Sequence, residues 1–296
     1  MRQSFSKKVI PYLFIAPTFI LLLIFSYFAI CFALKTSFQD YTLGYKAIWI
    51  GFGNYIKLFQ DQIFLASLAN QVLITVAAVV FNVFFPLLAA ELLYFVRHKK
   101  LADGIKTAFV IPMLVPGIVT ILIWRYLYNP QFGFNSILTA VGLKSLTHDW
   151  LNTPNTALWS IIFVGFPFVS GLYFLIFHSG LNAIGQELHE AAIIDGAKTF
   201  DIIRSIHLPN MVPYINVVFT LSLIGSLSGF GLVAATTGGG PGYSSMIPAM
   251  YMYKIAFGDG NMGYASSMGV IIFILIIILT MLSRALFSPK SKKEVD

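Results

Sequence analysis

Six long apolar segments constrain this chain more than any other feature of its sequence. An α-helix needs roughly 20 consecutive apolar residues to cross a bilayer core of about 30 Å. Only 10% of the residues are charged, against about 25% in ordinary soluble domains, so a soluble fold could not bury this much apolar surface. The short alternating segments of an outer-membrane barrel are not seen. We therefore predict an all-α membrane protein, a single transmembrane domain over residues 1–296, with six spans at 11–34, 67–96, 107–124, 155–177, 212–235 and 264–282.

The distribution of positive charge predicts the topology. Cytoplasmic loops of membrane proteins carry an excess of Lys and Arg. Most of the 19 Lys and Arg residues lie in the terminal segments and in the loops after the second and fourth apolar segments. Both termini and the loop 181–211 are thus predicted to be cytoplasmic, and the net charge of +7 needs no nucleic-acid partner. The apolar core of the first segment is too long for a signal peptide, so we expect it to be a membrane anchor.

Several kinds of chemistry have no basis in the sequence. Glu91 is the one charged residue inside the six segments, and we expect it to reach the interface or to pair with a neighbouring base, which disfavours an ion-coupled carrier. No GxxxxGK[ST] phosphate loop, HExxH pair or Gly-x-Ser-x-Gly elbow occurs. Cys31 is alone and cannot form an intrachain disulfide. We expect a protein that is not an enzyme and holds no cofactor, so energy for any pumping must come from another polypeptide.

Proline and glycine interrupt three of the predicted spans. Broken helices at membrane depth are tolerated where the freed backbone lines a cavity or packs on protein. Simple kinks and close helix packing are the alternative. The interrupting residues are Pro112, Pro116 and Gly117, then Gly165, Pro167 and Gly171, and finally Gly225, Gly229 and Gly231.

The predicted cytoplasmic loop 181–211 contains a polar, helix-forming stretch. "QELHEAAIID" has good helix formers, and Gly196 is expected to end this helix in a left-handed conformation. Thr199 is expected to cap a second short helix, which Pro209 should end. Two short helices of this kind fit a groove on another protein, although an ordinary interfacial loop has the same local signals.

The spacing within this loop resembles a known motif. Glu190-Ala191-Ala192, three residues, Gly196, nine residues, and then Ile206-His207-Leu208-Pro209 is similar to the "EAA" coupling motif of permease subunits in binding-protein-dependent ABC importers. The resemblance implies a type I importer permease fold and a loop that docks in the cleft of a cytoplasmic ATPase. By position, the docking residues would be Glu190, Ala191, Ala192, Asp195, Gly196, Ile206, Leu208 and Pro209.

Other stretches resemble the carbohydrate-uptake branch of that family. These are "GFGNYIKLF", "TGGGPG", "YMYKIAF" and "GYASSM". The resemblance, to the maltose/glycerol-phosphate type of first permease, implies a heterodimer with a second permease, two ABC ATPases that hold ATP and Mg²⁺, and an extracytoplasmic solute-binding protein. It also implies a carbohydrate substrate and a place in the lipids of a bacterial cytoplasmic (inner) membrane.

The same resemblance implies a substrate pathway. Its positions fall at Met113, Gly117, Ile161, Gly165, Phe168, Gly225, Ser226 and Gly229. Apolar residues and glycine stand where polar or larger aromatic residues would hold a sugar, although Phe168 could stack on a sugar ring. Either the cavity is wide or the second permease holds the ligand.

Three rival functions remain at this point. A permease for glycerol phosphate or a polyol should place basic residues in the pathway, where only Arg125 lies near an outer edge. A self-sufficient ion-coupled carrier or channel should show carboxylates within the membrane. A membrane-bound enzyme should show a nucleophile with its base. The stretch Phe52–Phe64 is expected to form an amphipathic outer helix, either for packing or for docking.

Overall fold

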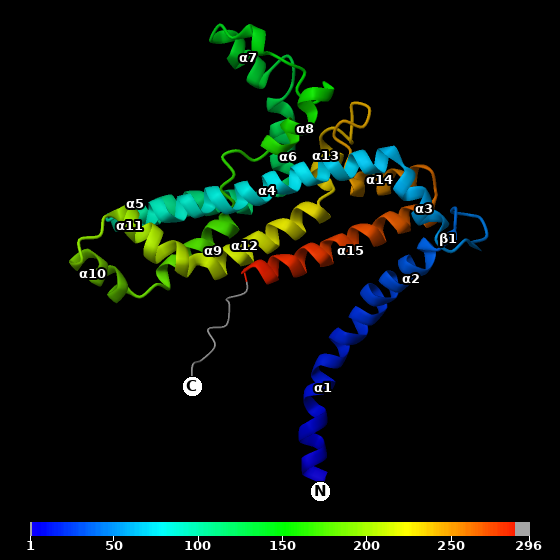
Figure 1. Cartoon of the computed structure of the whole chain (residues 1–296), viewed down its shortest axis with the longest axis horizontal. Coiled ribbons are helices and arrows are strands. Elements are labelled where there is room, and N and C mark those ends of the chain that lie inside the picture. Colours follow the sequence, from blue (N-terminus) through cyan, green and yellow to red (C-terminus); the bar gives the residue numbers. More distant parts are fainter. Residues whose placement is uncertain (1, 288–296) are drawn as a thin grey trace. The chain divides into compact units, whose positions relative to one another are not determined.

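The computed structural model describes residues 2–287, and these are mainly helical (Figure 1). The chain divides into two compact units, which we describe separately. One consists of Met1–Phe64 with Tyr251–Phe273, and the other of Leu65–Met250 with Ile274–Asp296.

The first unit begins with a long apolar helix. α1 (Arg2–Leu22) continues through a π-helical turn, η1 (Leu23–Tyr27), into α2 (Phe28–Ser37). Ile10–Ser37 is long and apolar enough to cross a membrane, in agreement with the first predicted segment. Its side chains are largely exposed within this unit, as expected of a helix whose surroundings are lipid or another membrane protein.

A short hairpin and a short helix follow in the same unit. β1 (Gln39–Asp40) pairs antiparallel with β2 (Ile48–Trp49), a feature that the all-α prediction omitted. α3 (Gly53–Gln60) confirms a helix within the amphipathic stretch, but it ends before Asp61. The Asp61 carboxylate accepts hydrogen bonds from the N–H groups of Ile63 and Phe64 and therefore starts a new helix.

The second unit contains most of the helices. After α3 the chain enters α4 (Gln62–Tyr94), which begins in the first unit and continues in the second. The elements that follow are α5 (Lys99–Val110), η2 (Ile111–Leu114), α6 (Gly117–Leu127), α7 (Gly133–Ala140), η3 (Lys144–Leu146), α8 (Pro154–Phe163), α9 (Gly171–Asn182), α10 (Gln186–Ile194), α11 (Thr199–Ile202), η4 (Ile203–His207), α12 (Leu208–Ser228), α13 (Gly231–Ala235) and α14 (Pro248–Tyr253). η5 (Lys254–Gly258) belongs to the first unit, and α15 (Met262–Phe287), which is divided between the two units, completes the described chain.

The predicted breaks in the spans are present. α5–η2 and α6 meet at an angle of 93°, at Val115 and Pro116, so the third apolar segment is a bent pair. The fourth segment is broken more severely, because α8 and α9 are separated by residues 164–170. Gly165 and Phe168 both have positive φ there, and Pro167 has no N–H to donate, so helical hydrogen bonds cannot continue.

These breaks reduce the number of continuous helices that are long enough to cross a membrane. In the described residues, four helices are long and apolar enough to cross a membrane, or five if the bent pair is counted as one span. Segment 155–177 does not form a single helix of that length. The mainly helical membrane fold is thus confirmed, while six spans and two cytoplasmic termini remain predictions. The tail residues Lys290, Lys292 and Lys293, which supported that topology, lie outside the described residues.

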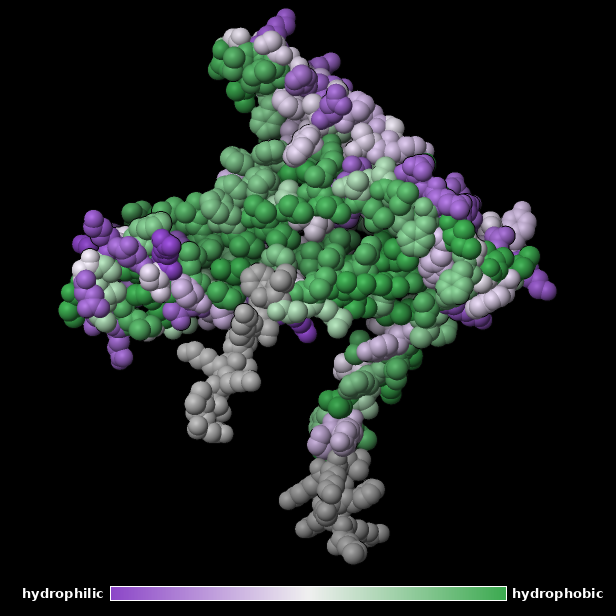
Figure 2. All heavy atoms as spheres, in the orientation of Figure 1, coloured by the Kyte–Doolittle hydropathy of each residue, from purple (hydrophilic) through white to green (hydrophobic). Residues whose placement is uncertain are grey.

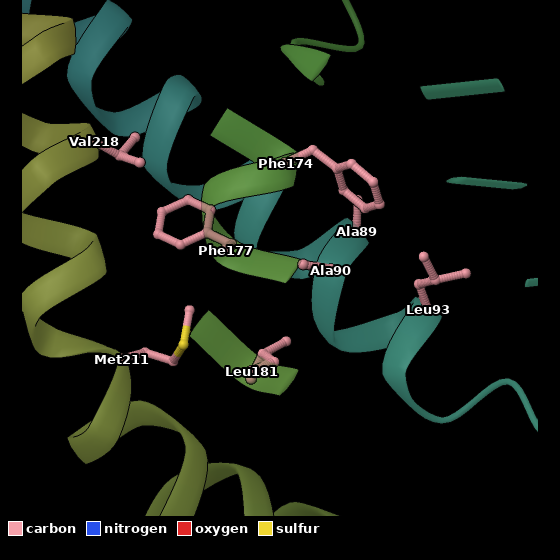
Figure 3. Packing of buried hydrophobic residues seen from close by; sticks show 8 residues of the cluster. All are labelled: Ala89, Ala90, Leu93, Phe174, Phe177, Leu181, Met211 and Val218. Atoms are coloured by element: carbon pink, nitrogen blue, oxygen red, sulfur yellow. The ribbon is translucent and has the colours of Figure 1, made fainter. Parts of the chain in front are cut away.

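The core of the second unit lies where α4, α9 and α12 meet (Figure 3). Its buried members are Ala89, Ala90, Leu93, Phe174, Phe177, Leu181, Met211 and Val218. Small residues allow close approach of these helices. A Cβ atom on Gly180 would lie 2.7 Å from the ring of Tyr214 on α12, so α9 and α12 pack at a distance that only glycine permits.

Hydropathy separates the two ends of this unit's surface. Hydrophobic side chains cover much of α4, α9 and α12, and hydrophilic residues gather around α10 and α11 (Figure 2). Such a division is typical of helices that leave the membrane and end in a polar loop.

Candidate functional site

The polar loop folds as the sequence predicted at its first helix. α10 ends at Ile194, and Gly196 follows with φ of +82°. Ala197 N–H donates to the Ala192 carbonyl at 2.9 Å, and Gly196 N–H donates to the Ile193 carbonyl at 3.0 Å. This pair of bonds is a Schellman motif, which satisfies carbonyls that the helix end would leave free. A Cβ atom on Gly196 would meet nothing within 4 Å, so the backbone conformation alone requires glycine.

The second helix of the loop differs from the prediction in two respects. Lys198, not Thr199, is the N-cap, and its N–H donates to the Asp201 carboxylate at 3.0 Å. Pro209 does not end the helix. The π-helical turn η4 precedes it, with Leu208 N–H donating to the Ile203 carbonyl, and this widened turn accommodates the missing proline donor. The helical run therefore continues unbroken from Thr199 to Ser228.

The motif residues lie mainly on the surface of this loop. Glu190, Ala191, Asp195, Gly196, Leu208 and Pro209 are exposed, and Ala192 and Ile206 are half-buried. The Glu190 carboxylate accepts a hydrogen bond from Gln186 at 2.9 Å, one turn earlier on α10. Large apolar residues on the loop are exposed as well, with Ile193 at 62% and Ile194 at 84%.

One residue of the motif is instead completely buried. His207 has no exposed surface, and its Nδ1–H donates to the Glu91 carboxylate at 2.7 Å. Its Nε2 lies 2.7 Å from Nε2 of His189 on α10. The predicted pairing of Glu91 with a base is confirmed, and the base is this histidine. The loop is thereby attached to the end of α4.

A cavity of about 260 Å³ lies between α4, α12 and neighbouring segments of the second unit. Four of the predicted pathway residues line it, Ile161, Gly225, Ser226 and Gly229. The other four, Met113, Gly117, Gly165 and Phe168, are not among its lining residues. The Phe168 ring stacks on Phe81, with centroids 4.3 Å apart, so this face of Phe168 is occupied.

Polar residues that the sequence analysis passed over also line this cavity. They are Gln71 and Asn82 on α4, Tyr173 on α9 and Ser222 on α12. The amide of Asn82 donates to the Ser222 hydroxyl at 2.9 Å. Gln71 and Asn82 place two amides inside an apolar segment. This signal could have identified them from the sequence, because polar residues within a span usually face protein or a cavity.

The side chain of Gln71 forms a hydrogen bond to the end of α12. Where the helix ends, the Ser226 carbonyl accepts a hydrogen bond from Gly229 N–H at 3.3 Å and a second one from Gln71 Nε2 at 3.0 Å. The same Nε2 donates to the Thr75 hydroxyl, whereas Gln71 Oε1 is buried with no partner among the described residues. An acceptor is therefore available beside the cavity.

Comparison with known proteins identifies the family. The family described as "Binding-protein-dependent transport system inner membrane component" matches residues 82–293. The chain belongs to this family. The probable ABC transporter permease YurN of Bacillus subtilis is 34% identical, over 97% of this chain and 98% of its own length.

Other similar proteins are described as transporters of sugars or polysaccharides. The multiple sugar-binding transport system permease MsmF of Streptococcus mutans is 31% identical, over 91% of this chain and 92% of its own. Among solved structures, a bacterial ABC transporter involved in the import of the acidic polysaccharide alginate has a chain with a TM-score of 0.87 and 21% identity. The match covers 98% of this chain and 99% of that one. The fold is that of an ABC importer permease.

The Schellman motif leads to a direct prediction. Gly196→Pro should leave the permease in the membrane and abolish uptake, because proline holds φ near about −65° and removes the N–H that bonds Ile193. Uptake of radiolabelled substrate and the amount of protein in membrane fractions are the measurements. Gly185→Ala, at the exposed start of α10 where φ is −59°, is the matched control and should transport normally. Normal uptake by Gly196→Pro would show that transport does not need this turn.

Proposed function

We propose that this chain is a transmembrane permease subunit of an ATP-driven ABC importer for a carbohydrate. Family membership along most of the chain and relatives named for sugar transport support this substrate class. The trehalose/maltose transport system permease MalF of Thermococcus litoralis, for example, is 29% identical over 94% of this chain. A self-sufficient ion-coupled carrier is not favoured, because the family's members serve transport systems that depend on a binding protein.

The exposed apolar surface of α10 is the observation that carries the coupling role. A helix outside the membrane gains nothing from presenting Ile193 and Ile194 to water, and exposed apolar patches mark interaction sites. Glu190, Ala191 and Gly196 lie exposed on the same loop. We propose that this surface docks in the cleft of an ABC ATPase. The ATPase would hold ATP and Mg²⁺, so that this chain itself needs no cofactor.

Movement of the docked loop would reach the cavity through a single helical run. Thr199–Ser228 leads from the end of the loop to the break at Gly229, a length of about 45 Å at 1.5 Å per residue. The cavity residues Ser222, Gly225 and Ser226 lie near the far end of that run. ATP-driven closure of the ATPases would thus move the cavity wall, which is what alternating access requires.

The cavity lining favours an uncharged glycan. No charged side chain lines it, whereas glycerol phosphate would need a basic partner. Hydroxyl, amide and carbonyl groups on its wall can exchange hydrogen bonds with sugar hydroxyls. Its volume of about 260 Å³ lies just below the roughly 300 Å³ at which ligand pockets begin, so we propose that a second permease completes the site.

The remaining partners follow from this assembly. A solute-binding protein would deliver the carbohydrate from outside, and a related transporter of 20% identity was solved with an alginate pentasaccharide-bound periplasmic protein. We propose one second permease, two ATPases and a bacterial cytoplasmic membrane location, with α10 and both termini in the cytoplasm.

Docking of α10 is tested by co-purification in mild detergent. Ile194→Asp should lose the ATPase while the second permease is retained, because a carboxylate in an apolar contact is costly to desolvate. The matched control is Ile137→Asp on α7, because Ile137 is also an exposed isoleucine. Recovery of the ATPase in equal amounts with Ile194→Asp and the control would contradict docking through this surface. A wild-type chain that purifies with no ATPase would contradict the importer itself.

The cavity assignment is tested by removing one amide. Asn82→Leu should lower substrate uptake about tenfold, because one polar contact is lost and Ser222 loses a donor, while the ATPase remains bound. Asn216→Leu removes an amide from α12 outside the cavity lining and should have little effect. Concentration-dependent uptake into proteoliposomes is the measurement. Equal uptake by the two variants would show that this cavity does not carry substrate.

A further inference from the structure

Three ionisable side chains form one buried chain at the base of the loop. Glu91 comes from α4, His207 from η4 and His189 from α10, and their exposed fractions are 6%, 0% and 9%. Both links through His207 measure 2.7 Å. Burying polar groups is costly unless each is bonded, so an arrangement of three such groups outside any cavity needs an explanation.

Aromatic rings close off this chain from solvent. The Tyr94 ring meets His207 edge-on with centroids 4.9 Å apart, and the Phe95 ring stacks on it at 5.8 Å. The Tyr94 hydroxyl also lies 3.5 Å from Nδ1 of His189. The links therefore operate in a medium of low polarity, where hydrogen bonds to charged groups are strong.

The geometry requires one proton between the two imidazole rings. His207 Nδ1–H donates to the Glu91 carboxylate, and the two facing Nε2 atoms can bond only if one proton lies between them. Either His189 donates to a neutral His207, or a doubly protonated His207 donates to a neutral His189. With a proton on both Nε2 atoms the link is lost, because two N–H groups then face each other.

We infer that His207 is a positioning residue for ATP coupling, which holds α10 to α4 through a link that persists only while one proton is shared with His189. This inference rests on the proposed docking of α10. Without the link, α10 would still dock on the ATPase, but only part of its movement would be transmitted to α4. ATP would be hydrolysed with less substrate imported.

The surroundings set the direction of pH dependence. Burial lowers the pKa of His189 below its ordinary value of 6.5, and the adjacent His207 lowers it further. The neutral form of His189 is thus favoured in the folded loop. When His207 carries both of its protons, protonation of His189 puts an N–H group on each of the facing Nε2 atoms. The link is then fully present above the ordinary pKa of His189 and is lost as the pH falls through the lowered one.

Other titratable groups lie close to this chain. Glu91 and Tyr94 face His207 from α4, and His189 faces it from α10. Tyr94 also borders a cavity lined by Arg97, Lys99, Asp103, Lys106 and His178. The control His178→Gln removes the histidine that borders this cavity.

The first experiment measures substrate imported per ATP hydrolysed, in proteoliposomes that contain the whole importer. His207→Phe keeps a ring but leaves Glu91 buried without its partner, so a second variant removes both groups. Glu91→Leu/His207→Phe replaces the ion pair by apolar groups, a change that is often tolerated. This double variant should retain the ATPase and import about tenfold less substrate per ATP. His178→Gln, a half-buried histidine outside the chain of contacts, is the control.

The second experiment varies the pH from about 5.5 to about 8. His189→Gln offers His207 either an amide N–H or an amide oxygen at every pH, so its import per ATP should stay level on the acid side, where wild type and His178→Gln decline. A double variant that couples like the control, or a His189→Gln profile that follows wild type, would overturn the inference while docking still stands. Failure of the wild-type chain to bind an ATPase would instead overturn the proposed function and this inference with it.

Discussion

A lipid bilayer offers no hydrogen-bond partners, and this constraint decides where the chain can depart from regular helix. At the end of α12 the Ser226 carbonyl accepts a hydrogen bond from Gln71 of α4, and the cavity lies beside that bond. The polar loop is held in the same way, through the bond between His207 and Glu91. Every irregular segment that matters to function is thus supported by a side chain from α4.

One continuous helical run joins the end of the polar loop to the cavity wall. Thr199–Ser228 begins in the polar loop and ends at the cavity. Pro209 sits inside it without ending it, because the π-helical turn η4 precedes the proline. The end of the loop and the cavity wall are therefore parts of one helical run, and the proposed mechanism depends on this continuity.

Much of this arrangement follows from sequence, where the signals are local. The apolar lengths, the breaks at proline and glycine, and the left-handed Gly196 each depend on a few neighbouring residues. Pairing across the fold could not be predicted, since Glu91 and His207 are 116 residues apart and nothing local relates them. The cavity amides Gln71 and Asn82 were missed although their place inside an apolar segment was a local signal. The severity of the break at residues 164–170 was also missed, because no sequence rule predicts positive φ at Phe168.

Cross-linking from α10 is the measurement that tests the central claim most directly. Cys31 is exposed, so it is first replaced by serine, and a single cysteine is introduced at the exposed Ala191. A short thiol-to-amine reagent is then applied to membranes that contain the assembled importer. The account predicts a covalent product between this chain and the ATPase, with a yield that changes when ATP is added. A chain that forms no product with the ATPase, in membranes where the ATPase co-purifies with it, would contradict the claim that α10 is the coupling element.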